Sequence, residues 1–422
     1  MIAGQATSKV EHAVNKPDEK PLFFERSILF HPWWVPSKGA CTAVDAEEFS
    51  LSMARPAPPL RDQPPPPPAP PKPTEPKRPP KSAIEAFLDF KDWLNTPPPK
   101  RPKTAVTPEI KKPRVKPFDI QQIPDAMDRI GWSMSAKLQR KWFAGELNYI
   151  TSDKGEALSV NQDGKPFPPD MIDTTMFKLD WILKFDRAKI KYEDLTRNKI
   201  FTKKARSVIV DMVKGTQPSQ YTVDPWELCG KNVHDLHRRW QYQFISVDSN
   251  GGEKFAMLFR RIQWGNGRFM DDLYGSLGAF AFYLSLGKYR YTTYVDRNSN
   301  VFGRIEIHEV CAYMRDIFTF YDRSTESGSQ YLGHWNHTGF VVLVDAIAIG
   351  ETTKKRGARL PYSKNGAIEN WTIYYPVYND SYRDWQLKHK QGGDLILYSD
   401  VRRIYFNRPV LIEFDFDTGE IL

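Results

Sequence analysis

The chain has 422 residues, a hydrophobic content of 40% and 12 tryptophans, enough for a sizeable core and two or three domains of ordinary size. Its formal net charge is +9, but residues 72–116 alone hold twelve Lys and Arg against five Asp and Glu, which is seven of the nine charges. The rest of the chain is almost neutral, and this argues against a folded face that binds nucleic acid.

The cysteines Cys41, Cys229 and Cys311 are odd in number and far apart. They fit neither a disulfide framework nor a zinc site, and they favour a reducing compartment. Residues 1–20 are polar and lack the apolar centre of a signal peptide. No apolar run reaches the ~20 residues that a membrane helix needs, so we expect no transmembrane segment.

Residues 1–55 are predicted to be an irregular N-terminal segment. The aromatic stretch LFFERSILFHPWWV (22–35) favours a short strand or a docking peptide, because its apolar surface needs a partner. Residues 56–117 contain 21 of the 34 prolines and form a Pro-rich basic linker. Proline fixes φ and lacks a backbone donor, so this linker is a semi-rigid spacer rather than a packed domain.

A short amphipathic helix is predicted inside the linker, at residues 82–95. Ser82 and Glu85 have the spacing of a capping box, and Pro97 ends the helix. A helix of this length is marginal alone, so it either docks on the chain's own domain, binds a groove on a partner, or stays weakly ordered. The residues expected to make this docking contact are Ile84, Phe87, Leu88, Trp93 and Leu94.

The folded region begins at residue 118, and its first part, residues 118–244, is predicted to be mainly helical. FDIQQIPDAMDRIGWSMSAKLQRKWFAG (118–145) favours one helix, with Pro124 in the first turn and Gly145 at its end. Residues 175–186 mix two periodicities and stay ambiguous. Further helices are predicted at 196–215 and at the start of 224–244, where Val233, Leu236 and Trp240 share one side.

Residues 245–422 form the β-rich part, because the apolar pattern changes there to a period of two. Strands are predicted within 274–295, with a turn at Gly287 and Lys288, and within 302–322, 339–350, 394–407 and 409–419. The expected fold class is therefore α+β. The helical part of residues 118–422 would pack on a mainly antiparallel β-sheet or sandwich.

The stretch YLGHWNHTGF (331–340) places His334 and His337 three residues apart. The glycines and the apolar strand that follow favour a turn that buries Trp335, and no further ligands with metal spacing lie nearby. We therefore expect no metal and no cofactor. His334 and His337 are kept as weak catalytic candidates, and the catalytic residues are otherwise unknown.

Other polar sets have weaker signals. His234 and His237 share a helix face, but Arg238 and Arg239 disfavour a bound cation, so a solvated helix flank is the simpler interpretation. Two acidic pairs could serve acid–base chemistry. An acidic trio on one face of the last strand could bind a cation or a basic partner, but a solvent-facing edge strand is the favoured interpretation of the trio. These acidic residues are Asp271 and Asp272, Asp316 and Asp322, and Glu413, Asp415 and Asp417.

Four blocks in order carry a family resemblance: residues 118–145, LYGSLGAFAFYLSLG (273–287), the run from Tyr313 to Phe340, and 374–400. Together they resemble an uncharacterised bacterial domain family found beside type VI secretion genes for the spike proteins VgrG and PAAR. The resemblance covers residues 118–422. It implies a bacterial protein among secreted effectors and their accessories, and it supplies no catalytic residues.

Three hypotheses follow. The first is a type VI secretion-associated effector, an antibacterial toxin of unassigned activity, made in the cytoplasm and delivered to a target cell without a signal peptide. The second is a non-enzymatic adaptor that links cargo to a secretion spike. The third is a β-rich protein that damages membranes. Expected partners are a secretion spike or adaptor protein and a cognate immunity protein. Whether the chain is an enzyme is left open.

Overall fold

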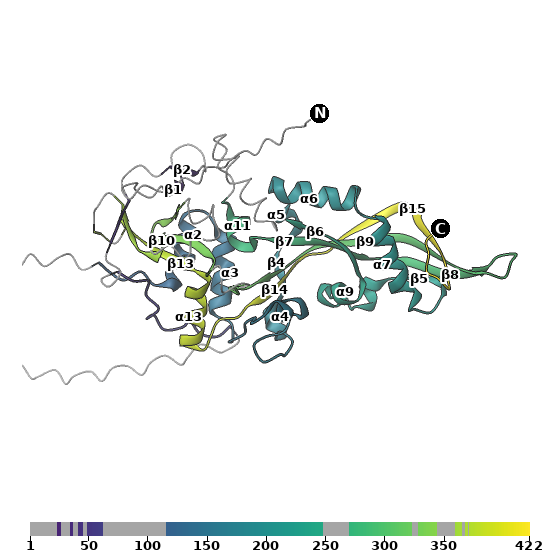
Figure 1. Ribbon diagram of the computed structural model, residues 1–422, viewed down its shortest axis with the longest axis horizontal. Helices are drawn as coiled ribbons and strands as arrows, with labels where there is room; N and C mark the ends of the chain where they lie inside the picture. The colour runs from purple at the N-terminus through teal and green to yellow at the C-terminus, as the bar shows by residue number, and fades with distance from the viewer. Residues whose placement is uncertain are drawn as a thin grey trace, which may run out of the picture. The chain divides into compact units, whose positions relative to one another are not determined.

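The computed structural model describes residues 23–26, 34–36, 41–44, 49–61, 115–247, 270–322, 328–343, 359–364, 368–369 and 371–422. The helix predicted at 82–95, with Ile84, Phe87, Leu88, Trp93 and Leu94, lies outside these residues. The architecture is α+β, with two sheets that are antiparallel in all pairings but one, as predicted (Figure 1).

The predicted helix at 118–145 is broken into two helices. The chain turns at Gly131, whose φ is +79°, a value that suits glycine because it has no Cβ. The carboxylate of Asp272 accepts hydrogen bonds from two backbone N–H groups of the first turn of the second helix, which restarts it. The prediction of one helix was therefore wrong at this point. The elements are η1 (Ile120–Gln122), α2 (Ile123–Arg129) and α3 (Ser133–Phe143).

The other α-helices that the structure describes up to residue 277 have between four and twelve residues. Residues 175–186 contain the end of a strand and a four-residue helix, which explains their mixed periodicity. The helix predicted at 196–215 begins only at Lys203, where Thr202 caps it through a hydrogen bond from the backbone N–H of Ala205. These helices are α4 (Asp153–Leu158), α5 (Leu179–Ile182), α6 (Asp186–Arg197), α7 (Lys203–Lys214), α8 (Pro225–Leu228), α9 (Val233–Trp240) and α11 (Asp272–Leu277).

A strand of 18 residues, β9 (Val301–Phe318), is the centre of the larger sheet. One edge of β9 pairs with β8 and then β7, and the other edge pairs with β15 and then β14. The single parallel pairing joins β4 to β14. The partner strands are β4 (Ile172–Phe177), β5 (Ser219–Val223), β6 (Gln241–Val247), β7 (Phe280–Leu286), β8 (Tyr289–Val295), β14 (Leu395–Ser399) and β15 (Arg402–Asp415).

The last two strands divide at a different place from the one predicted. The sequence suggests a break before Pro409, but the chain breaks between Ser399 and Arg402 and then continues through Pro409. The register of β15 against β9 shifts between Tyr405 and Val410, so the proline lies in an irregular part of the ladder. A residue without an N–H donor is tolerated at such a place.

Both faces of the larger sheet are covered by helices. Phe282 and Tyr283 are neighbours on β7, so their side chains point to opposite faces. The ring of Phe282 contacts Tyr192 of α6, and the ring of Tyr283 contacts His237 of α9. Figure 1 shows α6 and α9 on opposite sides of this strand.

The smaller sheet contains strands from the N-terminal segment. Its order is β2-β1-β11-β10-β13-β12-β3, with β1 on the edge of β11 and β3 on the edge of β12. The sequence predicted an irregular segment at residues 1–55, with a short strand as one option at 22–35. The structure has three short strands in this segment, and they complete the smaller sheet. They are β1 (Phe23–Arg26), β2 (Trp34–Pro36) and β3 (Cys41–Ala43), beside β10 (Tyr331–Asn336), β11 (Gly339–Leu343), β12 (Tyr362–Lys364) and β13 (Ile373–Tyr378).

Aromatic side chains join α3 to the helix α13 (Asn379–His389), in a core cluster that also contains residues of the smaller sheet. Trp142 of α3 and Trp385 of α13 are fully buried and lie 5.8 Å apart between ring centroids. Phe320 stacks on Tyr382 at 3.8 Å. Buried rings of this size contribute much of a core's stability, because each removes a large apolar area from water.

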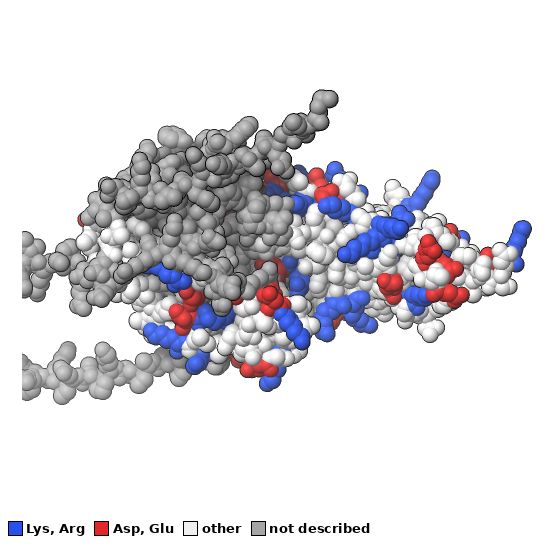
Figure 2. All heavy atoms as spheres, in the orientation of Figure 1, with Lys and Arg blue, Asp and Glu red and all other residues white. Residues whose placement is uncertain are grey.

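The described surface is mixed in charge. On the face drawn in Figure 2, Lys and Arg are interspersed with Asp and Glu over the described residues. This agrees with the nearly neutral charge of the chain outside the linker. None of the described helices is long and apolar enough to span a bilayer.

The contact between Gly303 and Phe414 yields a stability prediction. The two residues pair across β9 and β15, and a Cβ at position 303 would overlap the Phe414 ring. We expect Gly303→Ala to lower the free energy of unfolding by about 1–3 kcal/mol through overpacking. Chemical denaturation measures this.

Gly215→Ala is the matched control. Gly215 has φ −75° at the end of α7, and its nearest neighbour would lie 3.8 Å from the new Cβ. Its effect should stay within roughly 0.5 kcal/mol. Equal stability of Gly303→Ala and the parent chain would contradict the register of β15 on β9.

Candidate functional site

The stretch YLGHWNHTGF forms the β10–β11 hairpin. Trp335 is 3% exposed and stacks on Phe340 at 4.4 Å, so the predicted turn with a buried tryptophan is present. Gly333 and Gly339 have φ of +108° and +146°, and a side chain on Gly333 would collide with the Phe340 ring. Both glycines are needed for the local backbone and the packing of this hairpin.

His334 and His337 have different surroundings. His334 is completely buried, and its ring nitrogens contact the hydroxyl of Tyr331 and, at 3.0 Å, the carbonyl oxygen of Leu360. Burial lowers its pKa to about 4. His337 lies in the turn, edge-on to Phe118 at 5.1 Å.

Burial also lowers the pKa of His337, and the nearby cations Arg129 and Lys116 add to this effect. Among the described residues, His334 and His337 share no hydrogen-bond partner. The structure therefore places the two predicted candidates on one hairpin without joining them in one polar constellation.

A second pair of histidines has a more organised environment. His234 and His237 lie on α9, whose helix begins with a capping hydrogen bond to Asn232. The Nδ1 atom of His234 lies 3.0 Å from the hydroxyl of Tyr398, and the Nδ1 atom of His237 lies 3.1 Å from that of Tyr313. Both rings therefore face the sheet and are not the solvated helix flank that the sequence suggested.

The tyrosines of this group come from neighbouring strands. Tyr283 on β7 pairs with Tyr313 on β9, and Tyr398 on β14 pairs with Arg315 on β9. Residues 313 and 315 are two apart, so all four side chains lie on the sheet face that α9 covers. We call His234, His237, Tyr283, Tyr313, Arg315 and Tyr398 the His–Tyr–Arg cluster.

A chain of hydrogen bonds runs through the cluster. The hydroxyl of Ser285 lies 2.7 Å from that of Tyr313, which in turn contacts Nδ1 of His237. In the described part of the chain, the Nε2 atoms of His234 and His237 have no hydrogen-bond partner. A hydroxyl–hydroxyl–imidazole chain of this kind can pass a proton between its ends.

The protonation states in the cluster are set by burial and by Arg315. Burial, Arg315 and then His234 lower the pKa of His237 to about 3, and burial also lowers the pKa of His234. Burial raises the pKa of Tyr283 and Tyr398. At neutral pH the histidines are therefore neutral and the tyrosines keep their hydroxyl protons. Shifted titrating groups gathered in one place are a feature of functional sites.

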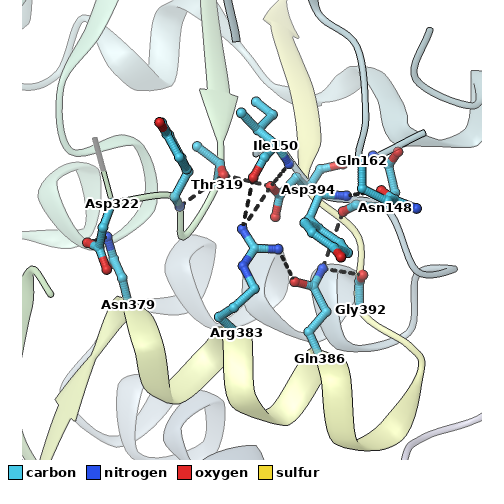
Figure 3. Close-up of polar contacts among 12 residues, drawn as sticks. Asn148, Ile150, Gln162, Thr319, Asp322, Asn379, Arg383, Gln386, Gly392 and Asp394 are labelled. Carbon is cyan, nitrogen blue, oxygen red and sulfur yellow. Dashed lines mark hydrogen bonds and ion pairs between the residues drawn. The ribbon is translucent and has the colours of Figure 1, made fainter. Parts of the chain in front are cut away.

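Another polar cluster surrounds Asp394, at the start of β14 (Figure 3). Its carboxylate accepts hydrogen bonds from Thr319 at 2.6 Å, from the backbone N–H of Ile150 at 3.1 Å and from the indole of Trp142 at 3.1 Å. Arg383 of α13 lies 3.8 Å away. Burial raises the pKa of this carboxyl group, and Arg383 and the donors oppose the rise.

The surroundings of Asp394 point to a structural role. Gln386 accepts a hydrogen bond from Arg383 and donates to the carbonyl oxygens of Gly392 and Asn148, so α13 is tied to the chain before α4 (Figure 3). Asp394 has no exposed surface, and both of its oxygens accept hydrogen bonds. A carboxylate with its acceptor sites occupied has little capacity left for a substrate.

Five of the seven acidic residues noted in the sequence have structural partners that explain them. Asp271 pairs with Arg187, and Asp272 caps α3. Glu413 pairs with Arg304. The other partners are Thr418 for Asp415, and Ser329 and Asn379 for Asp322. Among the described residues, no three His, Cys, Asp or Glu side chains are placed to hold a metal ion.

The sequence signal for the His–Tyr–Arg cluster is weak but real. Arg315 follows the apolar run from Val310 to Met314 within a strand, where a charged residue is unusual. Its neighbours in space come from segments that are remote in sequence, so spacing alone could not group them. The predicted docking residues of the 82–95 helix lie outside the described part of the chain, and their role stays a prediction.

Comparisons with known proteins give one family. A model described as a family of unknown function, DUF6402, matches residues 118–414. No curated protein and no solved structure matches the chain. The matched region contains every residue of the His–Tyr–Arg cluster, and the N-terminal strands fall outside it.

His334 yields a prediction on pH. Its folded pKa of about 4 lies below the ordinary value of about 6.5, so the unfolded chain binds a proton that the folded chain excludes. Stability from this residue is complete above pH 6.5 and is lost as the pH falls toward 4. Between pH 7 and pH 5, the protonation of His334 in the unfolded chain should lower the free energy of unfolding by about 2 kcal/mol.

The variant His334→Gln can keep an acceptor and a donor but cannot titrate. Urea denaturation of both proteins at pH 7 and pH 5 isolates the contribution of His334, because all other titrating groups are common to them. We expect a smaller loss for the variant. An equal loss in both proteins would mean that His334 is not held neutral by burial.

Proposed function

Since the chain belongs to DUF6402, a family of unknown function, we propose a function from its site and its resemblance. It is a type VI secretion-associated effector, toxic to a recipient bacterium, and its activity depends on the His–Tyr–Arg cluster. It is made in the cytoplasm, is delivered by a secretion spike or an adaptor protein, and is neutralised in the producing cell by a cognate immunity protein.

The observation that carries the proposal is the hydrogen-bonded chain Ser285–Tyr313–His237 at the side of α9. Buried polar groups often stabilise a fold no more than well-packed apolar residues of similar volume, so a chain of three such groups supports a role beyond packing. A neutral imidazole held by a hydroxyl suits general acid–base chemistry. The setting in type VI secretion is supported by the ordered sequence blocks at residues 118–145, 273–287, 313–340 and 374–400.

The test is expression of the full chain in a bacterium, once in the cytoplasm and once with an added export signal. We expect growth arrest in one compartment. Tyr313→Phe removes the hydroxyl that joins Ser285 to His237 and should restore growth with equal protein levels. His308→Gln changes a histidine of β9 that has no contact with the cluster, and should stay toxic.

Two outcomes would count against this function. Normal growth in both compartments, with folded protein detected, removes toxicity. Full toxicity of Tyr313→Phe removes the cluster as the active site, while the effector role stands. Measuring far-UV circular dichroism of the purified variants separates a lost activity from a lost fold.

The apolar stripe predicted at residues 82–95 favours a second function, an adaptor that binds a secretion spike. The predicted helix is short and needs a surface on which to bury its apolar residues. In a pull-down with a purified VgrG spike protein, the full chain should capture the spike, and the double variant Phe87→Ala, Trp93→Ala should not. Lys91→Ala, on the same segment, is the control. Absence of capture by the parent chain would end this proposal.

A further inference from the structure

Arg315 has an environment that differs from that of other well-packed arginines in this chain. Its Nη2 atom donates to the hydroxyl of Ser159 at 2.9 Å, and its Nε atom is buried with no hydrogen-bond partner. None of the described carboxylates forms an ion pair with it. The side chain is only partly exposed, so water can hydrate one part of the guanidinium and not the rest.

Other arginines of the chain show what a partnered guanidinium looks like here. Arg187 is bound by both oxygens of Asp271. Arg403 lies between Glu309 and Asp224. A charge removed from water is costly unless an opposite charge compensates it. The guanidinium of Arg315 is largely removed from water, but no described carboxylate forms an ion pair with it.

The groups around Arg315 are neutral hydroxyls, which accept hydrogen bonds from its guanidinium. The guanidinium lies close to the hydroxyls of Tyr283 and Tyr398, which contribute to its raised pKa. Burial keeps both tyrosines protonated. His237 and His234, which face the same space, are neutral. The site therefore offers positive charge and neutral hydroxyl groups. The carboxylate of Asp316, the next residue of β9, adds to the raised pKa of Tyr283, but the alternation of side chains along the strand turns Asp316 to the opposite face from Arg315.

We propose that Arg315, Tyr283 and Tyr398 bind a compact oxyanion, the phosphoryl group of a substrate. The proposal rests on the proposed function, because it names the substrate class of the same cluster. A carboxylate is satisfied by the two parallel N–H groups of a guanidinium alone. The additional hydroxyls from β7 and β14 match the further oxygens of a phosphoryl group. The proton-transfer chain through Tyr313 then lies beside the bound group.

The purified 422-residue chain is titrated with inorganic phosphate at constant ionic strength, and binding is measured by isothermal titration calorimetry. The melting temperature is measured with and without phosphate. We expect saturable binding and a higher melting temperature. Arg315→Met should weaken binding by about tenfold or more, because it removes the charge-assisted hydrogen bonds. Tyr283→Phe should weaken it less. Arg239→Met removes an equal charge from the exposed end of α9 and should bind like the parent chain.

A second readout separates binding from folding. Without phosphate, Arg315→Met should melt no lower than the parent chain, since it removes an uncompensated charge. A clearly lower melting temperature would make Arg315 a structural residue and overturn the proposal. Lack of saturable phosphate binding, or equal binding by Arg315→Met, would also overturn it. Acetate bound as tightly as phosphate would overturn the phosphoryl assignment.

These outcomes are independent of the toxicity assay. Toxicity that depends on Tyr313 without phosphate binding would leave the effector function and remove the substrate class. Phosphate binding without toxicity would leave the anion site and remove the effector function.

Discussion

The pairing of β9 along both of its edges is the constraint on which the rest of the structure depends. A strand of 18 residues is long enough to pair with two strands in succession along each edge. β8 and β7 pair along one edge of β9, and β15 and β14 pair along the other. The alternation of side chains then decides which residues face α6 and which face α9. The positions of Tyr283, Tyr313, Arg315 and Tyr398 follow from this pairing. Those of His234 and His237 follow from α9, which packs on the same face of the sheet.

Local patterns in the sequence identified most of the elements but not their partners. The alternating runs that contain β7 and β9 were recognised, and so was the apolar side of α9 formed by Val233, Leu236 and Trp240, all of which are buried. The break at Gly131 was missed, because the apolar spacing continues across it. It is stabilised by Asp272, a residue far along the chain, and no local pattern contains that information.

The same limit applies to the site. The sequence drew attention to His334 and His337 because they stand close together beside glycines, yet the hairpin that contains them uses their rings mainly for packing and local hydrogen bonds. His234 and His237 became candidates only through the folded structure, in which their Nδ1 atoms contact the hydroxyls of Tyr398 and Tyr313. The cluster combines residues from α9, β7, β9 and β14, so it exists only in the folded chain.

The parallel pairing of β4 with β14 has a consequence for how the His–Tyr–Arg cluster is assembled. β4 is synthesised well before the strand that it pairs with, and β14 also supplies Tyr398. Contacts of such long range form slowly, and an incomplete chain cannot make them. A nascent or prematurely ended polypeptide therefore carries the histidines and Arg315 without the tyrosine that completes their surroundings, and the cluster is complete only after β14 has been synthesised.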